Sequence, residues 1–323
     1  MRSLLLGLAL ALAAVPSAEA ARPTTADPRG AVARSPDQAR GNNAGWNAVV
    51  WLPAAQVQAM LPGKLRLAPQ RDPQGGLGVL HPVVLDVSHI TGGRLVIGGQ
   101  DSRVVTRRAY GQAGALWGMW GGPIGMMWGA AVGSAVGDAA HRVGEEAFGN
   151  YHEAMVLVPH VLGPRTNGSY TYVKGMKVDA SLPRQIDQDR GFGYGKEMAR
   201  FTGTDAIAAP DGTTMLRATV RGATPSHPVQ GAPAATQHRL QLAFAEPFVG
   251  ELRDGSGLYG VSRVTRSTRT GLYTPATASL QLTDRLGRGL AGQHEVTAPD
   301  GALRFQGLET TASAPVHARA DDL

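Results

Sequence analysis

From Trp46 onwards, short apolar runs alternate with turn residues, and this pattern limits the fold more than any other feature of the sequence. Glycine, proline and aspartate bound most of these runs, as they commonly bound β-strands. The segments expected to be strands are Trp46–Leu52, Gly78–Ile90, Tyr151–Val161, Tyr170–Val178, Phe192–Phe201, Thr213–Arg221, Arg239–Phe244, Gly257–Arg266 and Ala276–Leu282, with a short helix at Ala54–Met60. Many short strands with little helix predict a mainly β fold, either a barrel or a sandwich.

The two ends of the chain are expected to lie outside this β domain. Residues 1–20 contain one arginine, an apolar stretch and the small-residue exit Ala18-Glu19-Ala20, which is the pattern of a cleavable secretory signal. Residues 21–44 have no apolar period and are expected to form a flexible leader. We expect residues 45–310 to form one domain, residues 311–323 to form a flexible tail, and the protein to be periplasmic or secreted.

One segment, residues 108–148, departs from the strand pattern and is expected to be an insert in the domain. No charged residue lies between Arg108 and Asp138, and glycines recur there at helical spacing among tryptophans and methionines. Such spacing lets two helices approach closely, and Gly121-Gly122-Pro123 interrupts the segment, so a glycine-rich helical hairpin is expected. The hairpin could pack on the domain or another subunit, contact a membrane through residues 113–137, or act as a mobile lid.

Composition argues against several classes of function. The 31 basic residues outnumber the 25 acidic ones, but they are spread along the chain without basic runs, so nucleic acid binding is not expected. The absence of cysteine excludes disulfides and thiolate metal sites. The histidines near acidic residues are expected to make local hydrogen bonds, and we expect neither a metal nor a cofactor. These residues are His81, Asp86 and His89, and further along His152, Glu153 and His160.

Only four of the basic residues are lysines, and one of them, Lys196, lies in an aromatic and glycine-rich run. If this run forms a strand, every second residue shares one face, away from the glycines and from Glu197. The residues on that face are Phe192, Tyr194, Lys196 and Met198. An apolar face disfavours the charged ammonium and favours a free amine that can attack a carbonyl. The simpler interpretation is a half-buried lysine whose amine reaches water.

The sequence around this lysine, DRGFGYGKEMARF, resembles the segment of acetoacetate decarboxylase-like proteins that carries their Schiff-base lysine. NYHEAMVLVPHV and YTYVKGMKVD precede it in the order of the family's strands, WNAVVWLPAAQVQAMLP is similar to the entry strand and helix, and TDAIAAPDGTTMLRATVRG is similar to the next hairpin. The resemblance covers most of residues 45–290. It implies an acetoacetate decarboxylase-like β-barrel that acts on a small keto acid or related carbonyl compound. We also expect a homo-oligomer.

The resemblance also implies roles for individual residues. Lys196 would form the imine, Glu153 would act as the acid and base, and Arg190 would line or support the pocket. The remaining pocket side chains would be those of Tyr151, Phe192, Tyr194 and Met198.

The chain departs from the family pattern at several positions. Glu197 stands where the decarboxylases have a second lysine, and Gly195 stands where a proline is usual. No arginine is evident near the entry strand, where Asn43 or a neighbour takes its place, and the first pocket glutamate has no match around Val83 and Val84. One interpretation is imine chemistry on another carbonyl compound. The alternative is a non-catalytic exported envelope or binding protein, in which the barrel is a scaffold and the insert contacts a membrane or a partner.

Overall fold

The computed structural model describes residues 27–35, 37–97, 100–101, 150–165, 168–287, 289–297 and 301–323, together with residues 112, 115, 126–128, 130–132 and 134–135. The expected signal, the first six residues of the expected leader and most of the glycine-rich insert lie outside the described residues. Within this part of the chain, no helix is long and apolar enough to cross a membrane.

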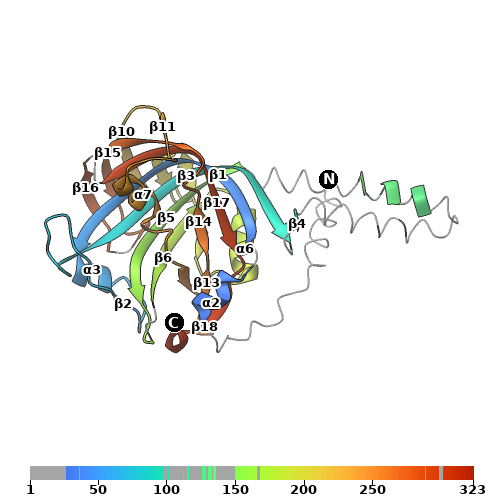
Figure 1. Cartoon of the computed structure of the whole chain (residues 1–323), viewed down its shortest axis with the longest axis horizontal. Coiled ribbons are helices and arrows are strands. Elements are labelled where there is room, and N and C mark those ends of the chain that lie inside the picture. The colour runs from blue at the N-terminus through green and yellow to red at the C-terminus, as the bar shows by residue number, and fades with distance from the viewer. Residues whose placement is uncertain are drawn as a thin grey trace.

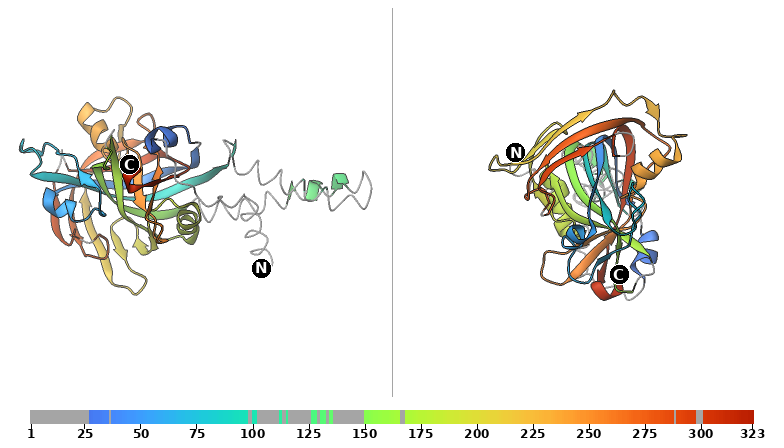
Figure 2. Two further views of the ribbon diagram at one scale, coloured as in Figure 1. Left: turned by 90° about the horizontal axis from the view of Figure 1, so that it is seen from below. Right: turned by 90° about the vertical axis from the view of Figure 1, so that its left-hand side faces the viewer.

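The fold is mainly β, and its strands form one large curved sheet (Figures 1 and 2). The strands are β1 (Asp37–Pro53), β2 (Arg66–Leu67), β3 (Leu80–Ile97), β4 (Gln100–Asp101), β5 (Asn150–Leu162), β6 (Ser169–Val178), β7 (Lys196–Met198), β8 (Arg200–Thr202), β9 (Ala206–Ala208), β10 (Thr214–Arg221), β11 (His227–Pro228), β12 (Phe248–Glu251), β13 (Leu258–Ser262), β14 (Val264–Arg266), β15 (Leu272–Leu282), β16 (Gly292–Val296), β17 (Ala302–Ser313) and β18 (Val316–Arg319). The helices are α2 (Pro28–Ala33), α3 (Ala54–Gln58), α6 (Ser181–Arg190), α7 (Ala234–Gln241) and the 3-10 helix η2 (Ala320–Asp322).

The centre of the sheet is built from long antiparallel strands. β1 pairs with β3 on one side and with β17 on the other. β3 also pairs with β5, and β5 pairs in turn with β6. The short strands β7 and β12 then join β6 in parallel. This order places β7, where Lys196 lies, beside β6, so that β6 alone separates it from β5.

The sheet is not closed into a barrel, which corrects that part of the expected fold. In β15, Leu272–Ala276 pair with β17, whereas Thr277–Leu282 pair with β10. β16 joins this second half of β15 as well. Because β15 changes neighbours midway, the sheet splits there, and within the described residues β8 and β16 each pair with a single strand and form edges.

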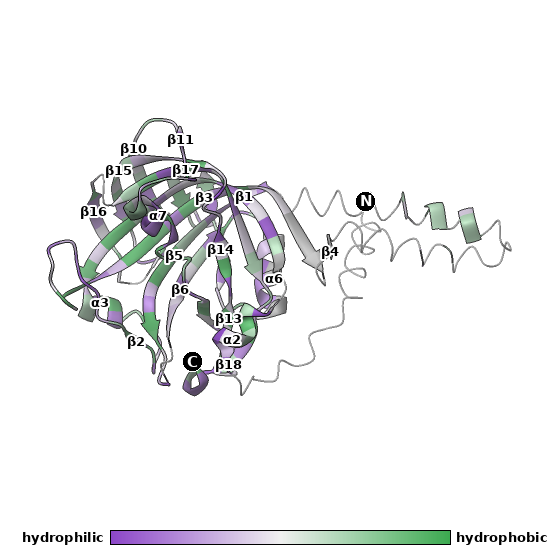
Figure 3. Cartoon of the chain, viewed as in Figure 1, coloured by the Kyte–Doolittle hydropathy of each residue, from purple (hydrophilic) through white to green (hydrophobic). Residues whose placement is uncertain are grey.

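Both faces of the central strands are buried. On β5, Ala154 and Val156 belong to one apolar core, whereas Met155 and Leu157 belong to the core on the other face. Figure 3 shows apolar residues along the central strands. A strand that is buried on both faces is a nearly continuous apolar run, and this explains why β5 was easy to recognise in the sequence. The candidate site lies on the face of Met155 and Leu157.

Most of the expected strands are confirmed, but Arg239–Phe244 was wrongly expected to be one. The residues up to Gln241 belong to helix α7, and the following turn carries Phe244 into the core. Leu240, Ala243 and Phe244 are buried at helical spacing. Since a short apolar run can suit either structure, its length and periodicity do not distinguish the two.

The ends of the domain are more ordered than expected. Residues 311–323, expected to be a flexible tail, instead complete β17 and form β18 and η2, and Leu323 is only 3% exposed. In the expected leader, residues 28–33 form α2 and residues 37–44 begin β1. Strand pairing explains both corrections, because β18 pairs with β13 and the start of β1 pairs with β17.

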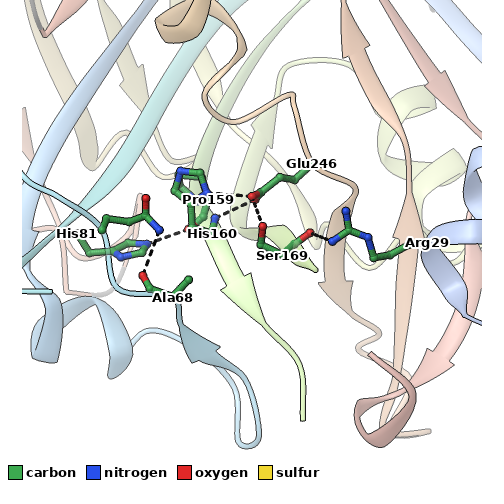
Figure 4. A network of polar contacts seen from close by, with 8 residues as sticks. Arg29, Ala68, His81, Pro159, His160, Ser169 and Glu246 are labelled. Carbon is green, nitrogen blue, oxygen red and sulfur yellow. Dashed lines mark hydrogen bonds and ion pairs between the residues drawn. The ribbon is translucent and has the colours of Figure 1, made fainter. Parts of the chain in front are cut away.

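A bulge interrupts β5 at Pro159 and His160, where its register against β6 shifts. His160 has a φ of 57°, a left-handed conformation that is rare outside glycine. The Glu246 carboxylate holds this residue by accepting hydrogen bonds from its backbone N–H and its Nδ1, each at 2.9 Å (Figure 4). Ser169 also donates to Glu246, and the Nε2 of His81 lies 2.8 Å from the carbonyl of Pro159. These histidines therefore hydrogen-bond locally, as expected.

Candidate active site

A cavity of about 120 Å³ lies on one face of the central sheet. Its floor contains a row of paired residues, Asn43 on β1, Ile90 on β3 and Tyr151 on β5. The other lining side chains are mostly apolar, and they include Met155, Met176, Phe192, Tyr194, Phe248 and Val264. A largely apolar cavity with a few convergent polar groups is typical of a site for a small molecule.

The polar groups at one end of this cavity are Lys196, Glu153 and Tyr151. The Nζ of Lys196 lies 3.5 Å from Oε2 of Glu153, and the side chains of the pair are 13% and 10% exposed. The hydroxyl of Tyr151 donates to the same carboxylate oxygen at 3.4 Å. Burial raises the pKa of Tyr151 well above its usual value, and the charge of Glu153 raises it further. Tyr151 therefore remains a hydrogen-bond donor at neutral pH.

Strand geometry explains how these three side chains meet. Tyr151 and Glu153 are two residues apart on β5 and so lie on the same face. Lys196 begins β7, where it pairs with Met176 of β6, and Met176 pairs with Met155 of β5. The lysine therefore shares the face of the sheet on which Glu153 lies.

The loop before β7 is held by Asp187, a buried residue of helix α6. The backbone N–H groups of Tyr194 and Lys196 donate to its two carboxylate oxygens at 3.1 and 3.0 Å. The backbone carbonyl of Asp187 accepts from the N–H groups of Gly191 and Phe192. A single residue thus fixes the backbone on both sides of the two aromatic side chains and at the lysine itself.

The glycines of this loop make close approaches possible. Gly191 ends helix α6 in the left-handed conformation, with a φ of 66°. Gly193 has a φ of 74°, and a Cβ atom there would lie 2.3 Å from the carbonyl oxygen of Gly250. Phe192 and Tyr194 consequently face the cavity, and the Tyr194 hydroxyl is hydrogen-bonded to Ser262.

The carboxylate that follows Lys196 in the sequence is engaged elsewhere. Glu197 forms ion pairs with Lys177 and, at 2.8 Å, with Arg253. Burial alone would raise the pKa of the Glu197 carboxyl, but the hydrogen bonds from these two cations bring the pKa below its usual value. Glu197 is not among the residues that line the cavity.

Five of the predicted site residues line one cavity, although the local structure differs from the expected strand. Phe192–Phe201 was expected to be continuous, but only Lys196–Met198 and Arg200–Thr202 are strands. Met198 packs beside the same core without lining the cavity. Arg190 is the last residue of α6, and its side chain lies outside the described residues. The five that line the cavity are Tyr151, Glu153, Phe192, Tyr194 and Lys196.

Sequence reasoning missed three polar residues of the site, which are Arg40 on β1, Asp187 on α6 and Thr310 on β17. Asn43, which also lines the cavity, was named only as a replacement for the arginine of the family pattern. Because β1 was expected to begin at Trp46, an arginine at position 40 was assigned to the leader. Alternation continued backwards from Trp46 would not have found it, because the register of β1 against β3 shifts between Arg40 and Asn42.

The fold is similar to that of a solved enzyme. That enzyme is MppR of enduracididine biosynthesis. Its structure with HEPES buffer matches with a TM-score of 0.51 at 10% identity over 88% of this chain and 89% of that chain. Its complex with pyruvate matches with a TM-score of 0.51 at 11% identity over 94% of each chain. This likeness shows the fold alone, and it agrees with the acetoacetate decarboxylase-like fold expected from the sequence.

Other comparisons add little. Acetoacetate decarboxylase from Legionella pneumophila matches with a TM-score of 0.48 at 12% identity over 88% of each chain. An acetoacetate decarboxylase-like enzyme from Sphingomonas wittichii RW1 matches with a TM-score of 0.49 at 13% identity, over 88% of this chain and 94% of that chain. No protein-family model matches the sequence, and no curated protein matches it.

Proposed function

We propose that this protein is a Schiff-base-forming enzyme, decarboxylase-like in its chemistry, that acts on a small keto acid through Lys196. The observation that carries the proposal is the pairing of a mostly buried primary amine with a mostly buried carboxylate, 3.5 Å apart, at one end of an apolar cavity. An amine in such a place can be the nucleophile of covalent catalysis, and the carboxylate can move protons for it.

The proposed reaction passes through an imine between the substrate and Lys196. The amine of Lys196 attacks the ketone carbon, and loss of water gives a protonated imine. In a β-keto acid the bond to the carboxylate then breaks, carbon dioxide leaves, and the electron pair neutralises the iminium nitrogen to give an enamine. Glu153 in its acid form protonates the enamine carbon, and water hydrolyses the imine to release the product and the amine.

Three observations support a small keto acid as the substrate class. Arg40 lines the cavity, and an arginine side chain can bind a carboxylate by two parallel hydrogen bonds. One water needs about 10–15 Å³ of such space, so a cavity of about 120 Å³ has room for only a small organic molecule. The similar enzyme MppR has been solved with pyruvate and with the condensation product of pyruvate and imidazole 4-carboxaldehyde.

Trapping with borohydride tests the proposal directly. The protein is incubated with pyruvate or acetoacetate, reduced, and mapped by peptide mass spectrometry. With only four lysines in the chain, the labelled position is unambiguous. We expect the label on Lys196 and none in Lys196→Ala. Lys174→Ala is the matched control, since Lys174 is a half-buried lysine of β6 whose amine donates to the carbonyl of Met60.

Labelling of Lys64, Lys174 or Lys177 in place of Lys196 would contradict the proposal. So would the absence of any label at millimolar keto acid, provided that the thermal melting curve shows a folded protein.

A further inference from the structure

A second polar group lies in the cavity away from the lysine. Asn43 is 2% exposed, and its Nδ2 donates to the hydroxyl of Thr310 on β17 at 3.1 Å. Its Oδ1 is buried and, among the described residues, has no hydrogen-bond partner. Six buried side-chain atoms of the described residues share this condition, and Asn43 is the only one of their residues that lines this cavity.

The sheet register shows that the Asn43 side chain points towards the cavity. Asn43 pairs with Ile90, and Ile90 pairs with Tyr151, so the three side chains share one face. All three residues line the cavity. Because Nδ2 is bonded to Thr310, Oδ1 is the atom of this amide that lacks a partner.

The distance between the lysine end of the cavity and Asn43 determines how long a ligand must be to contact both. Glu153 and the lysine amine lie over β5, whereas Asn43 projects from β1, two strands away. Neighbouring strands are about 4.8 Å apart, so about 10 Å separates the two backbones. Apolar side chains, such as those of Ile90 and Val264, line the cavity as well.

We infer that Asn43 and Thr310 form a second subsite, which accepts a hydrogen bond from a hydroxyl group at the far end of a short keto acid whose carbonyl reacts at Lys196. The inference rests on the proposed function and gives it a narrower substrate class. A buried acceptor without a partner is unfavourable, so it favours a ligand that supplies the missing donor. An apolar end of the cavity would instead prefer a methyl group to a hydroxyl group.

Pairs of matched ligands test this subsite, because the subsite predicts which member of each pair binds more tightly. The pairs are 4-hydroxy-2-oxobutanoate against 2-oxopentanoate, and 5-hydroxy-2-oxopentanoate against 2-oxohexanoate, in which a hydroxyl replaces a methyl of similar size. Dissociation constants are measured by calorimetry on Lys196→Ala, in which no imine can form. Rates of borohydride trapping are measured on the unmodified protein. We expect the hydroxyl compound of at least one pair to be favoured by about tenfold in both measurements.

Two variants of nearly unchanged shape provide the controls. Asn43→Leu removes the acceptor, and it should reverse the preference so that the methyl compound binds more tightly. Thr310→Val removes only the group that orients the amide, and it should reduce the preference without reversing it. Pyruvate has no far end, so its trapping rate in each variant measures the general effect of the substitution on the cavity, and the preference within each ligand pair is compared after dividing by that rate.

The outcomes separate this inference from the proposed function. If pyruvate labels Lys196 but neither hydroxyl compound is preferred, the subsite is refuted and the proposed function stands. If no compound labels Lys196, the proposed function fails. Equal affinities within both pairs on Lys196→Ala would overturn the subsite whatever the trapping shows, since a water molecule would then satisfy Asn43.

Discussion

Glu153 receives both polar contacts of the reactive end of the cavity, from the amine of Lys196 and from the hydroxyl of Tyr151. If it is the base that converts the imine of pyruvate into an enamine, it must remove a proton from the methyl group. The amine can still form the imine without that carboxylate. The two steps therefore separate in a variant that keeps the shape of the side chain but cannot take up a proton.

Glu153→Gln should slow the exchange of the pyruvate methyl protons with deuterium oxide by about a hundredfold or more, since general base catalysis contributes on this order. Borohydride labelling of Lys196 at saturating pyruvate should persist. Proton NMR follows the exchange, and peptide mapping follows the label. Unchanged exchange in this variant would show that another group moves the proton.

Lys196 was predicted from the alternation of its run together with the family resemblance, whereas Glu153 was predicted from the resemblance alone. Asp187 could not be found in this way, because its role consists of hydrogen bonds to a loop whose path depends on glycines packed against Gly250. Asn43 acquires its significance only from the lack of a partner in the folded chain.

The connection between helix α6 and strand β7 determines where the reactive amine lies. The strand expected over residues 192–201 was wrong because three glycines with positive φ, Gly191, Gly193 and Gly195, end the helix and turn the chain before Lys196. Asp187 replaces the missing ladder of strand hydrogen bonds with two of its own. It is a positioning residue for the proposed reaction.

Asp187→Asn should leave one of the two loop N–H groups without an acceptor, because the new amide nitrogen can only donate. We expect a loss of about 1–3 kcal/mol in the free energy of unfolding and a fall of about tenfold or more in the rate of trapping at Lys196, as small displacements of a nucleophile are costly. Denaturant titration and timed trapping, both well below the melting temperature, measure the two effects.

Asp179→Asn is the matched control, since the Asp179 carboxylate also accepts a backbone N–H, that of His152 at 2.7 Å, without lining the cavity. It should lower stability while leaving the trapping rate unchanged. Equal effects of the two substitutions on trapping would reduce Asp187 to a stabilising residue.

The contact between buried His81 and the bulge of β5 leads us to expect that the stability of the fold depends on pH. Burial lowers the pKa of His81 below its unfolded value of 6.5, although the contact with the carbonyl of Pro159 opposes this shift. The unfolded chain therefore binds a proton more readily than the native one. The stability due to neutral His81 is complete above pH 6.5 and is lost as the pH falls below it towards the folded pKa.

Melting temperatures measured between pH 7.5 and pH 5 should fall with pH, and they should fall less in His81→Asn, which cannot titrate but can still donate a hydrogen bond. The hydrogen bonds that Glu246 receives bring its pKa below 4.5 despite burial, so a further loss should begin only below about that pH. Parallel melting profiles of the two proteins would rule out His81 as the titrating group.

For the molecule as a whole, the sequence pattern was sufficient for the fold class but not for the path of the sheet. Alternation and turn residues identify the central strands, whereas the split of β15 between two neighbours depends on long-range pairing.

The glycine-rich insert lies between β4 and β5 in the sequence. Asn150 pairs with Thr91, directly beside the Ile90–Tyr151 pair that lines the cavity. The chain that follows the insert therefore rejoins the described sheet beside the cavity.

Removing residues 108–148 should leave the β domain intact. Asp101 pairs with Val96 and Asn150 pairs with Thr91, so the gap to be bridged corresponds to 96 − 91 = 5 residues of β3, or about 17 Å at 3.4 Å per residue. The residues that remain, 102–107 and 149, can span more than about 20 Å. The melting temperature and the trapping of pyruvate at Lys196 should therefore be close to those of the full chain.

The same deletion separates the roles considered for the insert. If it contacts a membrane, the full chain should stay with the membrane fraction after a carbonate wash and the deletion variant should not. If it joins subunits, light scattering should show a smaller particle. A folded deletion variant that no longer traps pyruvate would mean that the insert completes the cavity, because Tyr151, which follows the insert closely in the sequence, already lines the cavity.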